Sequence, residues 1–244
     1  MTEAGVPAAG AVAVRHAEVE RVVRSSCLST ATVSDVLDGL GIGNAVLPAR
    51  LRRFCGGERM FHGSAYTVSW VPTRKGPDIT AAGDSTWHQV RDFLVPDVED
   101  GRGLVYVSGA GPLVTEAALA GGLSCTYFTA QLRFEGVVLG GAVRDAAAVG
   151  RLERAVVASN LVPADSQGAY RVDDVGGRCV IGSVLVTTGD WVFSDLNGTV
   201  LVPAERLDDV LDAAVGIESS ERRISERVAA GERLPHVVDT IGRI

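Results

Sequence analysis

The feature that most constrains this chain is a short apolar run followed at once by glycine and then by charge. Residues 137–139, Val-Val-Leu, are typical of a buried β-strand, and Gly140-Gly141 allows a tight backbone turn at its end. Arg144 and Asp145 follow directly. A strand that delivers an adjacent cation and carboxylate just past a glycine pair is how α/β proteins place charged groups at the mouth of a site. A surface turn with an exposed ion pair is the alternative interpretation.

Similar apolar runs predict further strands, separated by glycine, proline and aspartate turns. They cover residues 61–71, 104–107, 155–158, 178–181, 184–186, 191–193 and 199–202. Helical periodicity predicts a helix over 32–40 capped by Ser29 or Thr30, and helices over 85–93 and 116–120. A further helix is expected to start near 121–122 with Leu123 buried. Residues 205–231 are expected to form two C-terminal helices or one bent helix. The chain is therefore mixed α/β.

Length and composition favour one globular domain. A chain of 244 residues that is 46% hydrophobic and 22% charged can bury one large core. Residues 1–17, rich in alanine, glycine and valine, are typical of a flexible N-terminal arm. We expect the domain to occupy residues 18–244, including the C-terminal helices.

Charge excludes some classes of partner. The net charge of −7 and pI near 5.1 argue against a broad nucleic-acid or anionic-membrane surface. The densest basic patch, Arg50 to Arg53 with Arg59, is either a solvated face or a local RNA contact. No charged leader and no apolar run near eighteen residues occurs, so we expect a cytoplasmic protein. The four cysteines and four histidines lack metal-ligand spacing. We expect the cysteines to be reduced and mostly in the core, and the histidines to be structural or surface residues.

Several motifs in order resemble one family. They are residues 30–41, 63–68, 121–123, 144–145, and 189–190 with 195–200. Over roughly residues 20–235 the chain resembles the RraA-like family, which includes class II 4-hydroxy-4-methyl-2-oxoglutarate aldolases and the regulator of ribonuclease E activity. The resemblance implies an α/β/β/α sandwich of the swivelling-domain type, assembled as a homotrimer or as a hexamer of two trimers.

The resemblance also implies a site. Asp145 would bind Mg²⁺ or Mn²⁺, a hard cation that suits a carboxylate. Arg144 would bind a 2-oxo acid and neutralise the enolate formed as pyruvate is released. From the residues themselves, Gly122 and the backbone N–H groups of Leu123 and Ser124 would face the substrate carboxylate at a helix N-terminus.

A glutamate from a neighbouring subunit completes the site in the resembling family. Glu221 is the best match in this chain, and Glu218 or Glu226 would replace it if the register shifts. As part of an exposed helix with alternating charge, these glutamates also fit a merely solvated face.

The main departure from the aldolase pattern is Gly122, where that pattern has an acidic residue. Three functions stay open. The first is a divalent-metal-dependent C–C lyase, acting as aldolase or as oxaloacetate-type decarboxylase. The second is a non-catalytic regulator of the RraA type. The third is a repurposed enzyme for a larger substrate, contacted by the loop over 74–87.

Overall fold

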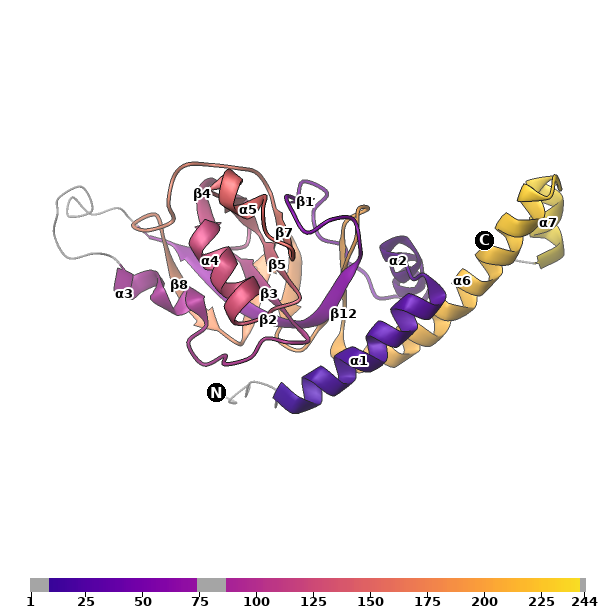
Figure 1. Cartoon of the computed structure of the whole chain (residues 1–244), viewed down its shortest axis with the longest axis horizontal. Helices are drawn as coiled ribbons and strands as arrows, with labels where there is room; N and C mark the ends of the chain where they lie inside the picture. The colour runs from indigo at the N-terminus through magenta and orange to yellow at the C-terminus, as the bar shows by residue number, and fades with distance from the viewer. Residues whose placement is uncertain (1–8, 74–86, 242–244) are drawn as a thin grey trace.

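A curled β-sheet forms the centre of the molecule, and the computed structural model describes residues 9–73 and 87–241 (Figure 1). The strands are β1 (Arg52–Arg53), β2 (Phe61–Pro72), β3 (Leu104–Gly109), β4 (Val114–Ala120), β5 (Gly136–Leu139), β6 (Gly141–Val143), β7 (Ala155–Ala158), β8 (Tyr170–Val175), β9 (Arg178–Ile181), β10 (Val184–Thr187), β11 (Trp191–Ser194) and β12 (Thr199–Val202). The helices are α1 (Ala9–Ser26), α2 (Thr30–Gly39), α3 (Trp87–Val90), α4 (Gly122–Thr126), α5 (Ala146–Val149), α6 (Leu207–Ala229) and α7 (Leu234–Ile241).

The main sheet has the strand order β1-β7-β5-β3-β2-β11-β12, and β8 also pairs with β2. Strands β2, β3, β5 and β7 run parallel, while β1, β8, β11 and β12 are added antiparallel. Two small sheets accompany it: β9 with β10, and β4 with β6. The predicted mixed α/β class is confirmed as a single domain with a curled sheet.

The parallel strands are buried on both faces, which explains their continuous apolar sequence. Along β3, Tyr106 points into the cluster beneath α4, whereas Val105 and Val107 point into the cluster shared with β9 and β10. Along β5, Val137 and Val138 divide in the same way. Because each such side chain contributes roughly 1.5–3 kcal/mol on burial, the strand register is strongly specified.

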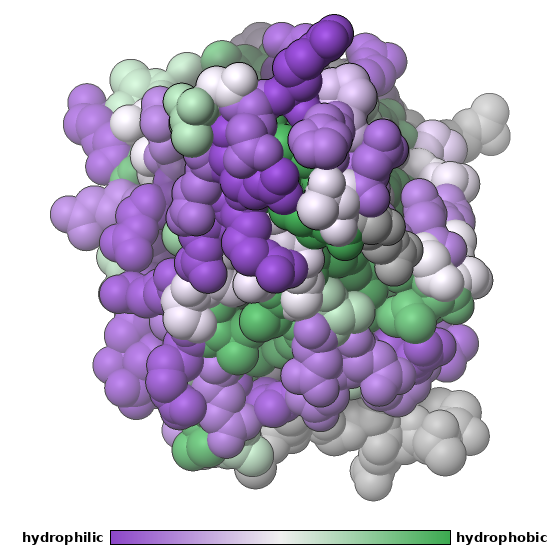
Figure 2. Space-filling model, turned by 90° about the vertical axis from the view of Figure 1, so that its right-hand side faces the viewer, coloured by the Kyte–Doolittle hydropathy of each residue, from purple (hydrophilic) through white to green (hydrophobic). Residues whose placement is uncertain are grey.

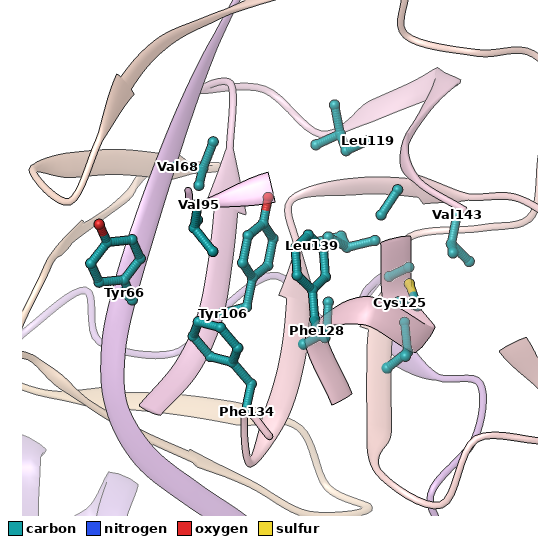
Figure 3. Packing of buried hydrophobic residues seen from close by; sticks show 14 of the residues in the cluster. Tyr66, Val68, Val95, Tyr106, Leu119, Cys125, Phe128, Phe134, Leu139 and Val143 are labelled. Atoms are coloured by element: carbon teal, nitrogen blue, oxygen red, sulfur yellow. The ribbon is translucent and has the colours of Figure 1, made fainter. Parts of the chain in front are cut away.

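Aromatic packing fixes α4 on this sheet. Phe128 lies in the π-helical turn (Tyr127–Gln131) that continues α4, and its ring stacks on that of Tyr106 with centroids 4.1 Å apart. Phe134 meets both rings edge-on, and Figure 3 shows the three rings grouped together. The segment that begins at Gly122 is therefore held in place by a buried anchor at its far end.

The strand predictions are confirmed, and one helix prediction is wrong. Strands cover the expected residues 61–71, 104–107, 137–139, 155–158, 178–181, 184–186, 191–193 and 199–202. Residues 116–120, expected as a helix, belong to β4. Their alanine and leucine content favours a helix, but β6 pairs with this segment in parallel and Ala118 N donates to Ala164 O at 3.0 Å.

Gly140 does not form the tight turn expected after β5. It bends the chain out of the main sheet, and Gly141 already belongs to β6. A Cβ atom at position 140 would lie 2.9 Å from Ile181 Cγ1 and 3.0 Å from Ser108 O. Glycine is therefore required at position 140, because other chain segments approach it closely. After the bend the chain continues as β6, which ends directly before Arg144 and Asp145.

The first helix corrects the expectation of a flexible arm over 1–17, since residues 9–17 lie within α1. Val12, Val19 and Val23 recur at helical spacing and are all buried. In addition, the His16 ring stacks on His62 at 4.6 Å. The segment packs against the rest of the fold through this apolar face. Composition alone does not reveal such a face. The domain limits 18–244 stay a prediction.

The C-terminal part also differs in detail. Of the two alternatives expected over 205–231, two helices or one that bends, the structure has a single helix, α6, which ends before Gly231 at φ +96°, and α7 follows beyond it. Figure 1 shows α6 and α7 extending away from the sheet, and Figure 2 shows that this end of the molecule is largely hydrophilic with small hydrophobic areas between. Within the described ranges, no helix is long and apolar enough to cross a membrane.

Two carboxylates hold the start of α2. Ser29 is the expected cap, and its Oγ accepts from Thr32 N at 3.1 Å. Asp195 accepts from Thr30 N at 2.9 Å and from Thr30 Oγ1 at 2.6 Å. Glu218 of α6 accepts from Ser29 N and from Thr32 Oγ1. Side chains from the β11–β12 turn and from α6 thus complete this helix terminus.

We expect Asp195→Asn to destabilise the fold by about 1 kcal/mol at pH 7, because an amide cannot accept both Thr30 bonds. Burial acts to raise the pKa of Asp195, but hydrogen bonds from Thr30 and Asn197 outweigh it and the pKa is lowered. The stabilisation is thus present above the ordinary aspartate pKa and lost as the pH falls through the lowered value. Urea unfolding from pH 3 to 7 should show the difference from wild type shrinking in acid. Asp38→Asn, an exposed aspartate on α2, is the control; a pH-independent difference would contradict the assignment.

Candidate active site

A cavity of about 380 Å³ lies beside the start of α4, and we name it the α4 cavity. Its walls come from α3 and the turn after it, from the end of β4, from α4, and from the segments that follow β6 and β7. Arg144, Asp145, Gly121, Leu123 and Ser124 line it, together with Asp165. The structure therefore brings most of the predicted site residues to one cavity.

Arg144 and Asp145 reach the cavity because β6 ends beside β4. Arg144 N donates to Ala120 O at 3.1 Å, which continues the pairing of the two strands. Asp145 then adopts the left-handed conformation, with φ 64° and ψ 50°, and ends the strand. Left-handed backbone is uncommon outside glycine and concentrates at functional sites. The Asp145 side chain is 52% exposed and borders the cavity, so it is accessible to a ligand.

The Asp145 carboxylate is bound to the α4 N-terminus. Its Oδ2 accepts from Gly122 N at 2.9 Å and lies 3.9 Å from Arg144 Nε. Gly122, which was predicted to bind the substrate, thus already uses its backbone N–H for a contact within the protein. The hydrogen bond orients Asp145 and leaves its second oxygen for other partners.

Gly121 and Gly122 create the room that this arrangement needs. A Cβ at position 121 would lie 2.8 Å from Asp145 Oδ2 and 3.0 Å from Arg144 Nε. A Cβ at position 122 would lie only 2.6 Å from Ala148 Cβ of α5. The acidic side chain that the aldolase pattern has at position 122 therefore has no space here, because α5 packs where it would stand.

Ser124 and Leu123, the other residues predicted to contact the substrate, lie in different environments. Ser124 is buried, and its Oγ accepts from Gly121 N at 2.9 Å, which caps α4. Leu123 was expected to be buried, but the residue is 89% exposed. The helix begins so close to Asp145 that its first turn presents Leu123 to the cavity instead of to the sheet.

Asp165 is a site residue that the sequence did not indicate. Its Oδ2 lies 3.4 Å from Arg144 Nη1 and accepts from Gln167 Nε2 at 3.1 Å. The segment after β7 carries it there, held by Ala118 N donating to Ala164 O and Val143 N donating to Asn160 O. A sequence shows no signal for this placement, because the segment returns over β4 and β6 only in the folded chain.

Glu221 does not line the α4 cavity. It is half-buried on α6, which extends away from the sheet in Figure 1. Glu218 is bound to the start of α2, so its carboxylate already has partners, whereas Glu226 is exposed. A role for Glu221 at the site of a neighbouring subunit stays a prediction.

The predicted divalent metal fits one mode of binding only. Within residues 9–73 and 87–241, no cluster of three or more His, Cys, Asp or Glu side chains that could hold a metal occurs. Mg²⁺ often binds through one or two carboxylates while waters and substrate oxygens complete its shell. Asp145, exposed and oriented by Gly122 N, suits that mode.

Charge supports the same assignment. The ionised side chains among the described lining residues are Arg144, Asp145 and Asp165, a net charge of −1. An anionic substrate would meet two carboxylates beside one guanidinium. A divalent cation would change the net charge of the cavity lining from negative to positive and so favour binding of the substrate.

Cys125, the cysteine within α4, is not a candidate nucleophile. Cys125 is fully buried, and its burial raises the pKa of the thiol to about 12. The neutral thiol is unreactive at physiological pH. The predicted loop over 74–87 lies outside the described residues except for Trp87, which lines the α4 cavity.

Comparison with known proteins identifies the family. A model of the RraA-like family, described as Aldolase/RraA, matches residues 30–201, more than half of the chain. The chain belongs to the RraA-like family. This family includes both aldolases and regulators of ribonuclease E.

Two relatives and one solved structure illustrate the range of the RraA-like family. Protein DlpA of Legionella pneumophila is 27% identical over 214 residues, 84% of this chain but 31% of DlpA, so the chain spans about a third of that relative. A protein of Albidiferax ferrireducens named "Putative 4-hydroxy-4-methyl-2-oxoglutarate aldolase" is 34% identical over 160 residues, covering 64% of this chain and 83% of that one. The Streptomyces coelicolor protein RraAS2, described as an unusual member of the RNase ES inhibitor RraA protein family, is 26% identical with a TM-score of 0.68, covering 85% of this chain and 96% of its own.

We expect Gly122→Ala to cost about 1–3 kcal/mol of stability, because its Cβ would overlap Ala148 Cβ. Ala148→Gly removes the obstructing atom, so the double variant should recover at least about 1 kcal/mol relative to the sum of the single changes. Urea unfolding of the four proteins measures this coupling. Strictly additive effects would mean that α5 moves aside freely and that position 122 is not sterically closed.

Proposed function

We propose that this chain is a divalent-metal-dependent C–C lyase that releases pyruvate from a 2-oxo acid. The observation that carries the proposal is the pairing of Arg144 with Asp145 at the edge of the α4 cavity, with the Asp145 carboxylate oriented by Gly122 N. The likeness to a relative named as an aldolase supports it.

In the proposed reaction, the C3–C4 bond of a 4-hydroxy-2-oxo acid breaks. The C4 hydroxyl loses its proton and becomes a carbonyl, while the bonding electron pair remains on C3 as the enolate of pyruvate, which is then protonated. Arg144 would bind the substrate carboxylate and the developing enolate charge, since guanidinium stays protonated and donates in a planar fork. A divalent ion held by Asp145 would supply Lewis-acid stabilisation of the 2-oxo group.

Asp165 is the described carboxylate best placed to accept the C4 hydroxyl proton, directly or through one water. Gln167 Nε2 donates to its Oδ2 at 3.1 Å and fixes its orientation, and Arg144 holds it from the other side at 3.4 Å. This role would replace the acid that is missing at position 122. Glu221 would contribute only from a neighbouring subunit of a homotrimer or hexamer.

A non-catalytic regulator of the RraA type is the second candidate. The closed space at Gly122 favours it, because the acid of the aldolase pattern cannot be restored without moving α5. The likeness to RraAS2, whose family is described as inhibiting RNase ES, also supports it. Binding to a ribonuclease without any pyruvate release would favour this candidate.

We expect pyruvate release from 4-hydroxy-2-oxo acids or oxaloacetate with Mg²⁺ or Mn²⁺, and its loss with EDTA. Asp145→Asn should lower kcat/KM at least about a hundredfold, because several kcal/mol of charge stabilisation are removed. Asparagine tolerates the left-handed conformation, so this variant tests the charge without straining the backbone. Asp38→Asn is the matched control, and light scattering reports the assembly of each protein. Unchanged activity in Asp145→Asn would remove the metal assignment.

We expect Asp165→Asn to separate two reactions. Cleavage of a 4-hydroxy-2-oxo acid should slow by about a hundredfold or more, since a general base contributes that much. Oxaloacetate decarboxylation breaks its bond by losing CO₂ and requires no hydroxyl deprotonation, so its kcat/KM should stay equal or rise. Both are measured by pyruvate release over pH 5–9. If both reactions slow together, Asp165 only positions Arg144.

A further inference from the structure

The lining of the α4 cavity consists of two chemically different groups of residues. Arg144, Asp145, Asp165 and Gln167 form the charged and polar group. The other group, which we name the apolar wall, consists of Trp87, Val90, Phe93, Leu94, Leu123 and Tyr127. The apolar wall thus comes from three elements: α3, the turn after it (Arg91–Leu94), and α4 with the π-helical turn that continues it.

The apolar wall is a built surface. Trp87 meets the Phe93 ring edge-on at 6.5 Å, and Phe93 in turn meets Phe128 of the core at 6.1 Å. Phe93 O also accepts from the Tyr106 hydroxyl at 3.1 Å. Trp87 and Leu123 nevertheless keep exposed fractions of 44% and 89%. Large apolar side chains so exposed at a cavity mouth gain free energy when a ligand covers them.

The charge of the site sets a second constraint. With a divalent cation, the described lining residues carry a net charge of +1, which one carboxylate neutralises. A second carboxylate would restore a negative charge, and Arg144 is the only cation among the described lining residues. The apolar wall carries no charged side chain to pair with it, and an unpaired charge is costly to desolvate.

We propose that the substrate is a monocarboxylic 2-oxo acid with a bulky apolar or aromatic group beyond C4, rather than a dicarboxylate. The inference rests on the proposed function for the location of the 2-oxo end. Arg144 and the metal at Asp145 take the 2-oxo carboxylate end, and the apolar wall covers the tail. Cleavage of such a 4-hydroxy-2-oxo acid releases pyruvate and an apolar or aromatic aldehyde.

Binding tests the inference without turnover. The probes are 2-oxo-4-phenylbutyrate and 2-oxoglutarate, which both lack the C4 hydroxyl and so cannot undergo the cleavage. Calorimetric titration with Mg²⁺ present should give at least about tenfold tighter binding of the phenyl compound. Equal or tighter binding of 2-oxoglutarate, or no binding of the phenyl compound at millimolar concentration, would overturn the inference.

A charge placed in the apolar wall should reverse the preference. Leu123→Lys adds an ammonium group at a side chain that is already exposed, so the fold is not at risk. We expect this variant to bind 2-oxo-4-phenylbutyrate more weakly and 2-oxoglutarate more tightly, with each Kd changing by about fivefold or more. Leu185→Lys, at an exposed leucine of β10 outside the cavity, makes the same change in net charge and should leave both unchanged. Identical behaviour of the two variants would overturn the inference.

Turnover separates this inference from the proposed function. 4-Hydroxy-2-oxo-4-phenylbutyrate should release pyruvate with a higher kcat/KM than 4-hydroxy-4-methyl-2-oxoglutarate. Faster cleavage of the dicarboxylate would overturn the substrate class but leave the lyase in place. Absence of pyruvate from every compound would overturn the lyase, while the binding preference would still decide which ligand class the cavity takes.

Discussion

The candidate site depends on the hydrogen bond from Gly122 N to the Asp145 carboxylate. This contact joins the start of α4 to the end of β6, two segments more than twenty residues apart. It exists because Gly121 and Gly122 carry no side chain and let the backbone approach Arg144 and Asp145 closely. Asp145 has left-handed backbone at this close approach, and both Arg144 and Asp145 line the α4 cavity.

The packing of α5 against Gly122 explains why position 122 has no acidic side chain. The carboxylate expected there is not simply deleted, because α5 occupies its space through Ala148. A second carboxylate instead reaches Arg144 as Asp165, from the segment that follows β7. Arg144 is thus placed between two aspartates, and the site keeps two acids from different positions in the chain. A divalent ion and one substrate carboxylate would balance that charge.

Packing explains why some expectations were right and others wrong. The strands of the main sheet are apolar on both faces because both faces are buried, so their apolar runs predict them well. Segment 116–120 has the composition of a helix but forms β4, since its pairing with β6 outweighs local propensity. Residues 9–17 have the composition of an arm but form part of α1, because Val12 finds a buried surface.

The sequence by itself determined the mixed α/β class, the strands of the sheet, the family resemblance and the pairing of Arg144 with Asp145. These depend on local patterns, because burial and turns leave marks within a few residues. Only the tertiary structure decided that Asp165 joins the site, that Leu123 faces the cavity, and that Glu221 lies away from its own site. Each of these depends on where a distant segment comes to lie, which is set by the packing of the whole sheet and not by the neighbouring residues.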